Sequence, residues 1–395
     1  MPRPSLVDRL SQANGERAAA GLSRRLRTVT QTQGMRVQIS GHALISFASN
    51  DYLGLGQDPR IVSALQSAAN EWGVGATAAH LLGGHRGPHQ QLEEEIADWL
   101  GYPRALLFST GMMANLGVLA TLLKRGDICL QDRLNHASLI DGARLSGADL
   151  RRYPHGDVEA AERQLQSKPE AAALLATDGV FSMDGDVAPL PALAALCLRE
   201  QALLMVDDAH GIGVIGDCGR GSVSAAKLGV ADVPLLMVTL GKAIGTFGAL
   251  VLGEAATIDA LIQFARPYIY TTAMPPALAA ATLVSVRIAR EEDWRRERLR
   301  ALIDQFRAGA MHRGFALMPS TSAIQPVLIG TAEQATRLSN QLEQYGYYVP
   351  AIRPPTVPEY TARLRVTLSA GHAFAEVDGL LDALVLAVKE TPLRD

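Results

Sequence analysis

Two hydrophobic patterns alternate along the chain from about residue 58 onward. Short apolar runs of the kind that form buried strands are separated by longer stretches in which apolar residues recur every three or four positions, as on one face of a helix. The strand-like runs begin at Ala105, Ile128, Ala172, Leu203, Leu235 and Gly248, and the helix-like stretches cover 60–72, 89–100 and 113–124. This alternation predicts an α/β fold with a mostly parallel sheet covered by helices on both faces.

The pattern changes after about residue 285, where a charged amphipathic stretch at 291–310 predicts a long helix. The segments that follow alternate between strand-like and helix-like patterns, at 324–330, 331–346, 363–369 and 376–388. We therefore predict three parts. They are an N-terminal segment 1–45, a large domain 46–285 and a small C-terminal α+β domain 286–395. We expect the N-terminal segment to form a helix and a short extended piece along the main body.

Composition argues against several classes of function. A chain of 395 residues with 48% hydrophobic content can bury a sizeable core, and its net charge of −3 without a basic block gives no support for a nucleic-acid surface. No signal-peptide pattern and no apolar run of roughly 18 residues is present, so we expect a cytoplasmic protein without a membrane span. The three cysteines suit neither a disulfide framework nor a zinc site.

Polar side chains follow several of the predicted strands at their carboxyl ends, where the functional loops of such sheets gather. They are Thr177, Asp178, Ser182, Asp207, Asp208, His210, Thr239 and Lys242.

Lys242 lies between glycines in TLGKAIG and is one of only five lysines among 37 basic residues. A lysine amine whose pKa is lowered by partial desolvation attacks carbonyls and forms Schiff bases, and Gly241 and Gly245 would let a planar group approach the backbone. A surface position is nevertheless the commoner role of a lysine, by about 10 to 1. Lys242 alone therefore does not identify a site.

Asp207 ends the apolar run LLMVD. A carboxylate at the polar end of a buried strand can hold a proton on a pyridine nitrogen, which keeps such a ring electron-withdrawing. Strand alternation sends Asp207 and Asp208 to opposite faces, and Asp207 fits this task better. The alternative roles are metal ligand and helix cap, although no metal-binding spacing adjoins this residue.

Two other segments could contact a cofactor. STGMMAN, residues 109–115, follows a strand and opens a helix, so its backbone N–H groups can bind a phosphate with help from the helix dipole. His136 in DRLNHAS can stack its ring on a flat cofactor. N-capping and packing are the commoner roles of such a turn and of a single histidine.

Taken in chain order, these residues resemble the pyridoxal 5'-phosphate (PLP)-dependent α-oxoamine synthases, which have the aspartate-aminotransferase-like fold called PLP fold type I. The matching stretches lie nearly continuously between residues 47 and 369. They are FASNDYLGL, FSTGMMANLG, DRLNHASLIDGARLSG, TDGVFSMDGDVAPL, MVDDAHGIGVIG, TLGKAIGTFG, IYTTAMPP and AIRPPTVP.

The resemblance implies roles for the cofactor-binding residues. Lys242 would bond covalently to PLP, Asp207 would hold the ring nitrogen, and His136 would cover the ring face. The residues expected on the ring oxygen are Ser182 and His210, and those expected on the phosphate are Gly111, Met112 and Thr239. Thr271 and Thr272 would reach that phosphate from the partner subunit, because the family forms homodimers with shared active sites.

The resemblance also implies substrate contacts. Arg353, with Asn50 beside it, would bind the amino-acid carboxylate, and the candidates for the acyl substrate are Arg24 and His80. His80 stands where the family commonly has arginine.

Two further positions depart from the family pattern. Met112 stands where an aromatic residue is usual. The N-terminal arginine of the family aligns with no single residue among Ser23, Arg24 and Arg25.

The family condenses an amino acid with an acyl thioester and releases CO2 and the free thiol. AIRPPTVPEYTARLRVTLSAGH and MDGDVAPL resemble the members that join L-alanine to pimeloyl-CoA or pimeloyl-acyl carrier protein. Three alternatives stay open: condensation of glycine with acetyl-CoA or succinyl-CoA, an aminotransferase, and a non-catalytic PLP-binding regulatory module.

Overall fold

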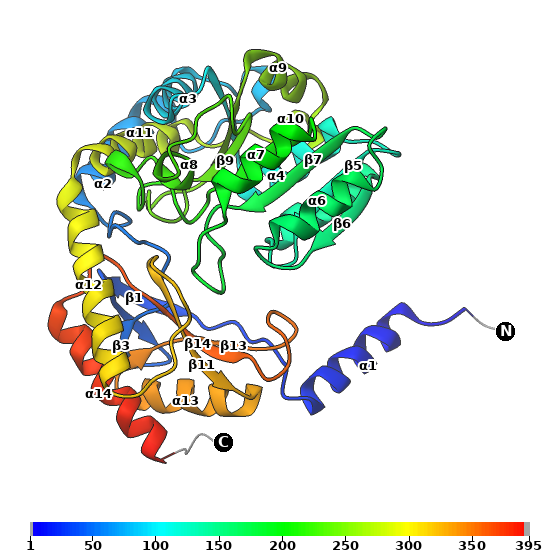
Figure 1. Cartoon of the computed structure of the whole chain (residues 1–395). Coiled ribbons are helices and arrows are strands. Elements are labelled where there is room, and N and C mark those ends of the chain that lie inside the picture. Colours follow the sequence, from blue (N-terminus) through cyan, green and yellow to red (C-terminus); the bar gives the residue numbers. More distant parts are fainter. Residues whose placement is uncertain (1–2, 391–395) are drawn as a thin grey trace.

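The computed structural model describes residues 3–390 and has two bodies joined by the long helix α12 (Asp293–His312), as Figure 1 shows. None of the helices within residues 3–390 has the length and apolar character needed to cross a membrane.

The larger body is built on a seven-stranded sheet with the strand order β4-β10-β9-β8-β7-β5-β6. Its strands are β4 (Arg104–Phe108), β5 (Ile128–Asp132), β6 (Asp149–Tyr153), β7 (Ala173–Asp178), β8 (Leu203–Asp207), β9 (Leu235–Thr239) and β10 (Ala249–Gly253). Only β10 runs antiparallel to its neighbours, and the other pairs are parallel. The predicted mostly parallel sheet is therefore confirmed.

Helices cover both faces of this sheet. One face packs against α3 (Gly87–Leu100), α6 (Val158–Gln166), α7 (Leu190–Arg199) and α11 (Pro276–Glu291). The other packs against α4 (Gly111–Leu122), α5 (Ala137–Ser146), α9 (Ala255–Phe264) and α10 (Arg266–Ile269). Because both faces of the inner strands are buried, their sequences are dominated by apolar runs, whereas the edge strand β6 reads DLRRY.

The remaining elements of this body are short or lie at its edge. They are α2 (Pro59–Trp72), which packs against α11, α8 (Gly221–Ala225) and two single turns, η1 (His80–Leu82) and η2 (Asp217–Gly219).

The smaller body combines two sheets with helices α12, α13 (Ala332–Gln344) and α14 (Phe374–Glu390). An antiparallel sheet has the order β11-β14-β13, with β11 (Ile324–Gly330), β13 (Ala351–Ile352) and β14 (Ala362–Thr367). A second sheet joins β1 (Val29–Gln33), β2 (Arg36–Ile39) and β3 (His42–Ser46) to β12 (Tyr347–Tyr348).

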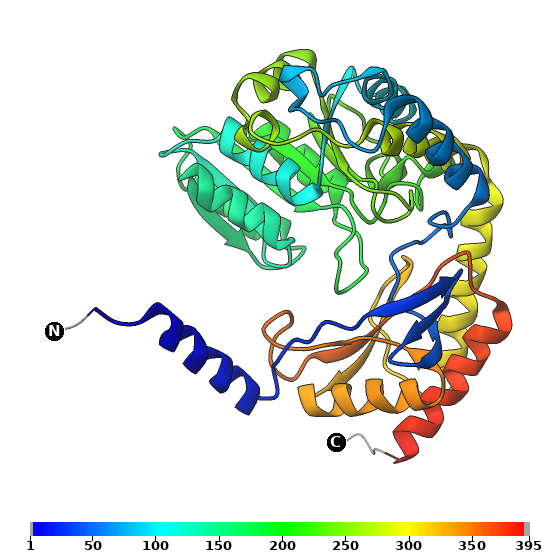
Figure 2. The ribbon, with the colours of Figure 1, turned by 180° about the vertical axis from the view of Figure 1, so that it is seen from behind.

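The N-terminal segment differs from the prediction. It contains three strands instead of one short extended piece, and β3 pairs in parallel with β12 of the smaller body. Helix α1 (Leu6–Ala19) has no buried residue and lies away from both bodies in Figures 1 and 2, so it does not run along the main body. The boundaries at residues 45 and 285 stay predictions, since α11 runs through residue 285.

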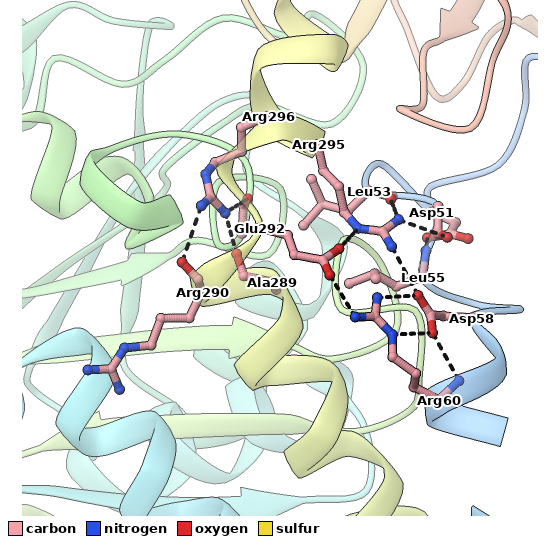
Figure 3. Close-up of polar contacts among 12 residues, drawn as sticks. Asp51, Leu53, Leu55, Asp58, Arg60, Ala289, Arg290, Glu292, Arg295 and Arg296 are labelled. Atoms are coloured by element: carbon pink, nitrogen blue, oxygen red, sulfur yellow. Dashed lines mark hydrogen bonds and ion pairs between the residues drawn. The ribbon is translucent and has the colours of Figure 1, made fainter. Parts of the chain in front are cut away.

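A charged network fixes the junction between α11 and α12 (Figure 3). The buried Arg295 donates hydrogen bonds to Leu53 O at 2.8 Å, to Asp58 Oδ2 at 3.0 Å and to Glu292 Oε2 at 2.8 Å. Arg60 joins Asp58 and Glu292 from the other side. The junction of the two bodies is thereby tied to the loop that precedes α2.

Candidate functional site

A cavity of about 200 Å³ lies at the carboxyl ends of the parallel strands. Its walls come from the loops that follow β4, β5, β7, β8 and β9, because the ends of parallel strands meet at one edge of a sheet. The lining residues are Gly111, Met112, Asn115, His136, Ser138, Asp178, Ser182, Asp207, Ala209, His210, Met237, Thr239 and Lys242. Eight of the ten residues that the sequence analysis assigned to the cofactor line this cavity, and the other two are Thr271 and Thr272.

Lys242 enters the cavity from the loop after β9. Its Nζ lies 2.8 Å from His210 Nε2, and burial lowers the pKa of Lys242 to about 8 against the opposing effect of Asp207 and Asp178. The unprotonated fraction of the amine near neutral pH is therefore larger than for an ordinary lysine, which favours a role as a nucleophile or base.

The glycine that follows Lys242 serves the loop itself. Gly245 has a φ of +68°, and a Cβ there would lie 2.6 Å from Gly56 N. This glycine allows the lysine loop to pack against the loop before α2, and the structure gives no role for it in admitting a planar group.

Asp207 lies at the end of β8 and is 4% exposed. Its Oδ2 accepts a hydrogen bond from Asn115 Nδ2 at 2.7 Å, and Oδ1 accepts one from Ala209 N at 3.1 Å. Asp208 lies outside the cavity lining and accepts from Ser222 N, in line with strand alternation. The carboxylate that faces the cavity is therefore that of Asp207.

Asn115 connects Asp207 to His136. The Asn115 amide also donates to Ser138 Oγ at 2.8 Å, and Ser138 Oγ lies 2.7 Å from His136 Nδ1. His136 Nδ1 also accepts a hydrogen bond from Ser138 N at 3.3 Å, and a neutral imidazole whose Nδ1 accepts carries its proton on Nε2. The network orients both side chains that were predicted to contact the ring.

Asp178 is a second buried carboxyl group in the cavity wall. Burial and the neighbouring Asp207 carboxylate raise the pKa of Asp178 well above its usual value, while its Oδ1 accepts a hydrogen bond from His136 N at 3.2 Å. Asp178 thus holds the backbone of the residue that covers the cavity.

An anion can bind where α4 begins. Thr110 caps this helix by accepting from Met113 N, so the N–H groups of Gly111 and Met112, which line the cavity, precede the first intrahelical donors. Thr239 lines the same cavity and donates its hydroxyl to Gly248 O at 3.1 Å. The helix dipole adds to the attraction of a negatively charged group.

These groups fit PLP, the cofactor that the resemblance implies. Asp207 can bind its pyridine nitrogen, Lys242 its carbonyl carbon, Ser182 and His210 its ring oxygen, and the start of α4 its phosphate. The buried Asn115 Oδ1 has no hydrogen-bond partner among residues 3–390, which leaves an acceptor available beside the cavity.

Arg353 does not lie where the sequence analysis placed it relative to Asn50. Its Nη1 donates to Gly21 O at 2.9 Å, whereas Asn50 Oδ1 accepts from Arg365 Nη1 at 3.3 Å and Nη2 at 3.4 Å. Arg365 is 6% exposed and also donates from Nε to Ser182 O at 2.7 Å. The guanidinium beside the cavity wall is therefore that of Arg365.

His80 is packed inside the larger body and does not line the cavity. Its ring stacks on Tyr268 with the centroids 4.7 Å apart, and its Nδ1 lies 3.1 Å from His85 Nδ1. Burial lowers the pKa of His80 to about 3, so the ring is neutral. Within one subunit, this position is unsuited to a charged contact with an acyl substrate.

Three other predicted contacts are not brought to the cavity by a single chain. Thr272 forms a β-bridge with Ala79, Thr271 is adjacent to it, and Arg24 lies exposed between α1 and β1. Thr271 and Thr272 were predicted to act from the partner subunit and Arg24 to contact the acyl substrate, and all three roles stay predictions.

Sequence reasoning missed several residues that support the site: Tyr52, Asn115, Ser138 and Arg365. Tyr52 and Asn115 lie in FASNDYLGL and STGMMAN, the stretches that carried the resemblance, so the motifs contained a signal. Arg365 also lies in a quoted stretch, AIRPPTVPEYTARLRVTLSAGH, but ARLRVT has an ordinary strand pattern that does not single out one buried arginine.

Comparison with known proteins agrees with this geometry. The family model described as aminotransferase class I and II matches residues 42–384. The chain is 56% identical over 398 aligned residues to an 8-amino-7-oxononanoate synthase of Xanthomonas axonopodis pv. citri, covering 100% of this chain and 99% of the relative.

Two solved structures extend the comparison. A serine palmitoyltransferase from S. paucimobilis with bound PLP and myriocin superposes with a TM-score of 0.93 at 30% identity, covering 98% of this chain and 99% of that one. An 8-amino-7-oxononanoate synthase of Francisella tularensis gives a TM-score of 0.77 at 33% identity, covering 88% of this chain and 98% of that one.

Proposed function

The chain belongs to the aminotransferase class I and II family, and from that premise we propose that it joins L-alanine to a pimeloyl thioester in a PLP-dependent decarboxylative condensation. The products are 8-amino-7-oxononanoate, CO2 and a free thiol, and the reaction is a step of biotin biosynthesis. The observation that carries the proposal is the presence of Lys242 and Asp207 in the walls of one cavity, in a chain 56% identical to a synthase of that name.

PLP, when bound, would draw electrons from the Cα of alanine. Asp207 would keep a proton on the ring nitrogen, and the Asn115 amide would hold its carboxylate in place. Lys242 would take the proton from Cα and return one after CO2 has left, which its lowered pKa permits. The bond to the acyl carbon forms as the thiol leaves, and the alanine carboxylate departs as CO2.

Arg365 would bind the carboxylate of alanine. Its fork-shaped guanidinium donates to the carbonyl oxygen of Ser182, a residue of the cavity lining, and to Asn50 Oδ1, and a desolvated carboxylate needs such a donor. This role replaces the one that the sequence analysis gave to Arg353.

A homodimer with shared active sites and a cytoplasmic location form the rest of the proposal. Thr271 and Thr272 would complete the phosphate site of the partner subunit. The acyl carrier is either CoA or an acyl carrier protein.

The test is a matrix of amino acids and thioesters. Alanine, glycine and serine are each incubated with pimeloyl-CoA, acetyl-CoA, succinyl-CoA and palmitoyl-CoA, and thiol and CO2 release are followed. We expect the highest kcat/KM for alanine with the pimeloyl thioester. A higher value for another pair would assign the chain to another reaction of this chemistry, and conversion of PLP to its amine form without CO2 release would indicate an aminotransferase.

Lys242→Ala should reduce thiol release to the background rate, because the chain then lacks the amine that bonds the cofactor and moves the proton. Lys389→Ala, at an exposed lysine of α14, is the matched control and should keep full activity. Borohydride reduction followed by peptide mapping should place a pyridoxyl group on Lys242. Activity that survives in Lys242→Ala would remove the Schiff base from the proposal.

A further inference from the structure

Tyr52 connects two residues of the site without reaching the cavity itself. It lies in the loop between β3 and α2, is 1% exposed, and its hydroxyl lies 2.6 Å from His210 Nδ1 and 3.2 Å from Asn50 Oδ1. On the other side of the imidazole, His210 Nε2 lies 2.8 Å from Lys242 Nζ. A series of close polar contacts therefore runs from Asn50 through Tyr52 and His210 to Lys242, and the single hydroxyl proton of Tyr52 can be donated to Asn50 Oδ1 or to His210 Nδ1 but not to both.

The imidazole of His210 is neutral. Burial lowers its pKa well below the usual value, and the positive charges of Lys242 and Arg365 act in the same direction. A neutral imidazole has one N–H donor and one acceptor nitrogen, so only one of its two neighbours receives the proton. Which nitrogen carries that proton decides what the ring offers to Lys242.

The distances decide where the proton of Tyr52 points. At 2.6 Å, the contact with His210 Nδ1 falls in the range of O–H donors, about 2.5–3.0 Å, and is shorter than the usual N–H donor distance of about 2.9–3.0 Å. The contact with Asn50 Oδ1 is longer, and that oxygen already accepts from Arg365. Burial raises the pKa of Tyr52 to about 12, so the hydroxyl keeps its proton.

We propose that Tyr52 is a positioning residue whose hydroxyl donates to His210 Nδ1 and so holds the His210 proton on Nε2, facing Lys242 and the cavity. The inference deepens the proposed function and depends on Lys242 being the reactive amine. An unprotonated Lys242 amine can accept from Nε2–H, whereas an ammonium group has no lone pair to accept with. Tyr52 therefore favours the unprotonated amine. With PLP bound, the same N–H would face the ring oxygen that His210 is predicted to contact.

Several charged groups act on Lys242 besides this hydrogen bond. Asp207 from β8, Asp178 from β7 and Asp208 from the loop after β8 favour its ammonium form, and Arg365 from β14 opposes it. These charges act through space on Nζ, and none is placed to select between the two nitrogens of His210 as Tyr52 is. The position of the proton on His210 therefore distinguishes the effect of Tyr52 from the effects of the surrounding charges on Lys242.

The loop that carries Tyr52 is held on both sides. Arg295 from α12 donates to Leu53 O, directly after Tyr52 (Figure 3), and Asp51 accepts from Leu55 N at 2.8 Å and Gly56 N at 2.9 Å. These contacts leave the hydroxyl little freedom to move away from His210.

Tyr52→Phe is the test, because it removes only the hydroxyl. In cofactor-free protein, the rate at which an amine-reactive reagent modifies Lys242 is measured between pH 6 and 10 by peptide mass mapping. We expect the rate at pH 7 to fall about three- to tenfold, the range that one hydrogen bond supplies, because the pKa of Lys242 rises. Tyr102→Phe is the matched control, since it removes a buried tyrosine hydroxyl that donates to Val233 O, and neither residue lines the cavity. It should leave the rate unchanged.

Nitrogen-15 NMR of histidine-labelled protein reads the tautomer directly, with and without PLP, and His210→Asn assigns the signal among the nine histidines. In the unsubstituted protein, Nε2 should be protonated and Nδ1 should be the acceptor. In Tyr52→Phe, the two forms should mix.

A proton on Nδ1 in the unsubstituted protein would overturn the proposal even if Tyr52→Phe failed to fold. An unchanged Lys242 rate in folded Tyr52→Phe, or an equal change in Tyr102→Phe, would overturn it too. Failure of the proposed function would appear separately, as absent thiol release with every substrate pair.

Discussion

At the scale of single residues, two arginines are candidates for binding the substrate carboxylate. Arg353 donates from Nη1 to Gly21 O of the N-terminal segment and to Thr336 Oγ1 of α13. Arg365 donates to Asn50 and to the carbonyl of Ser182, which lines the cavity. The structure therefore favours Arg365 for a role that the motif AIRPPTVP had given to Arg353.

Arg365→Lys should raise the KM for alanine about 10- to 100-fold, because a hydrogen-bonded contact to a charged group is worth about 1.5–3 kcal/mol and lysine lacks the fork. Arg353→Lys should change it less than about threefold. Both values come from steady-state kinetics at saturating thioester. A larger increase in KM for Arg353→Lys than for Arg365→Lys would indicate that Arg353 binds the carboxylate of alanine.

The residues of the cofactor site were the easiest to predict. Asp207 is the last residue of a buried strand, and His210 and Lys242 each lie three residues after one, so strand assignment placed them at one edge of the sheet. His80 and Arg353 could not be placed in this way, because their surroundings depend on side chains from distant parts of the chain, such as Tyr268 for His80.

At the scale of elements, the loop 179–188 that carries Ser182 is held from both bodies. His155 contacts it from the larger body, with Nε2 at 2.7 Å from Asp186 Oδ2 and Nδ1 at 3.1 Å from Asp132. Arg363 of β14 holds it from the smaller body through Asp184 at 2.7 Å. The hydrogen bonds with Asp132 and Asp186 raise the pKa of His155 to about 10.

This raised pKa predicts how stability depends on pH. The folded-state pKa of about 10 exceeds the unfolded value of about 6.5, so the contribution of His155 is complete below about pH 6.5 and is lost as pH rises towards 10. His155→Gln should therefore lower the free energy of unfolding at pH 6, by about 1 kcal/mol after allowance for solvent screening, and much less at pH 10.

Urea unfolding at the two pH values measures this difference. His312→Gln, at an exposed histidine near the end of α12, is the control and should have little effect at either pH. A loss for His155→Gln that is equal at pH 6 and pH 10 would show that the charge of His155 does not stabilise the loop.

Two strands show why some secondary structure could not be predicted from the sequence. Strand β6 reads DLRRY and lies at the edge of the sheet, where charged side chains meet solvent and no continuous apolar run forms. Strand β12 has only two residues and exists because it pairs with β3, more than 300 positions earlier in the chain. Neither element has a local sequence pattern that distinguishes it from a loop.

At the scale of the whole molecule, large apolar side chains are exposed on segments close to the predicted partner contacts. Val74 is 90% exposed, Leu82 80% and Tyr270 72%, and the bridge between Ala79 and Thr272 joins their segments. Apolar surface of this kind is typical of an interface. It supports the proposed dimer.

Leu82→Glu should convert a dimer of twice the 42.1 kDa chain mass into monomers, because a charge buried at an interface is costly. Light scattering after size exclusion measures the mass, and thiol release should fall with it. Leu198→Glu, at an equally exposed leucine on α7, is the control and should stay dimeric and active. A monomeric unsubstituted protein, or an unchanged Leu82→Glu dimer, would contradict the interface.

The sequence by itself determined the α/β alternation, the parallel sheet and the gathering of Lys242, Asp207 and His210 at one edge. These follow from local hydrophobic patterns and from the rule that parallel strands end on the same side. Only the tertiary structure decided that Arg365 lies beside Asn50, that Tyr52 contacts His210 and that the N-terminal strands join the smaller body. Such contacts join residues far apart in the chain, and their energies depend on a three-dimensional packing that no local pattern records.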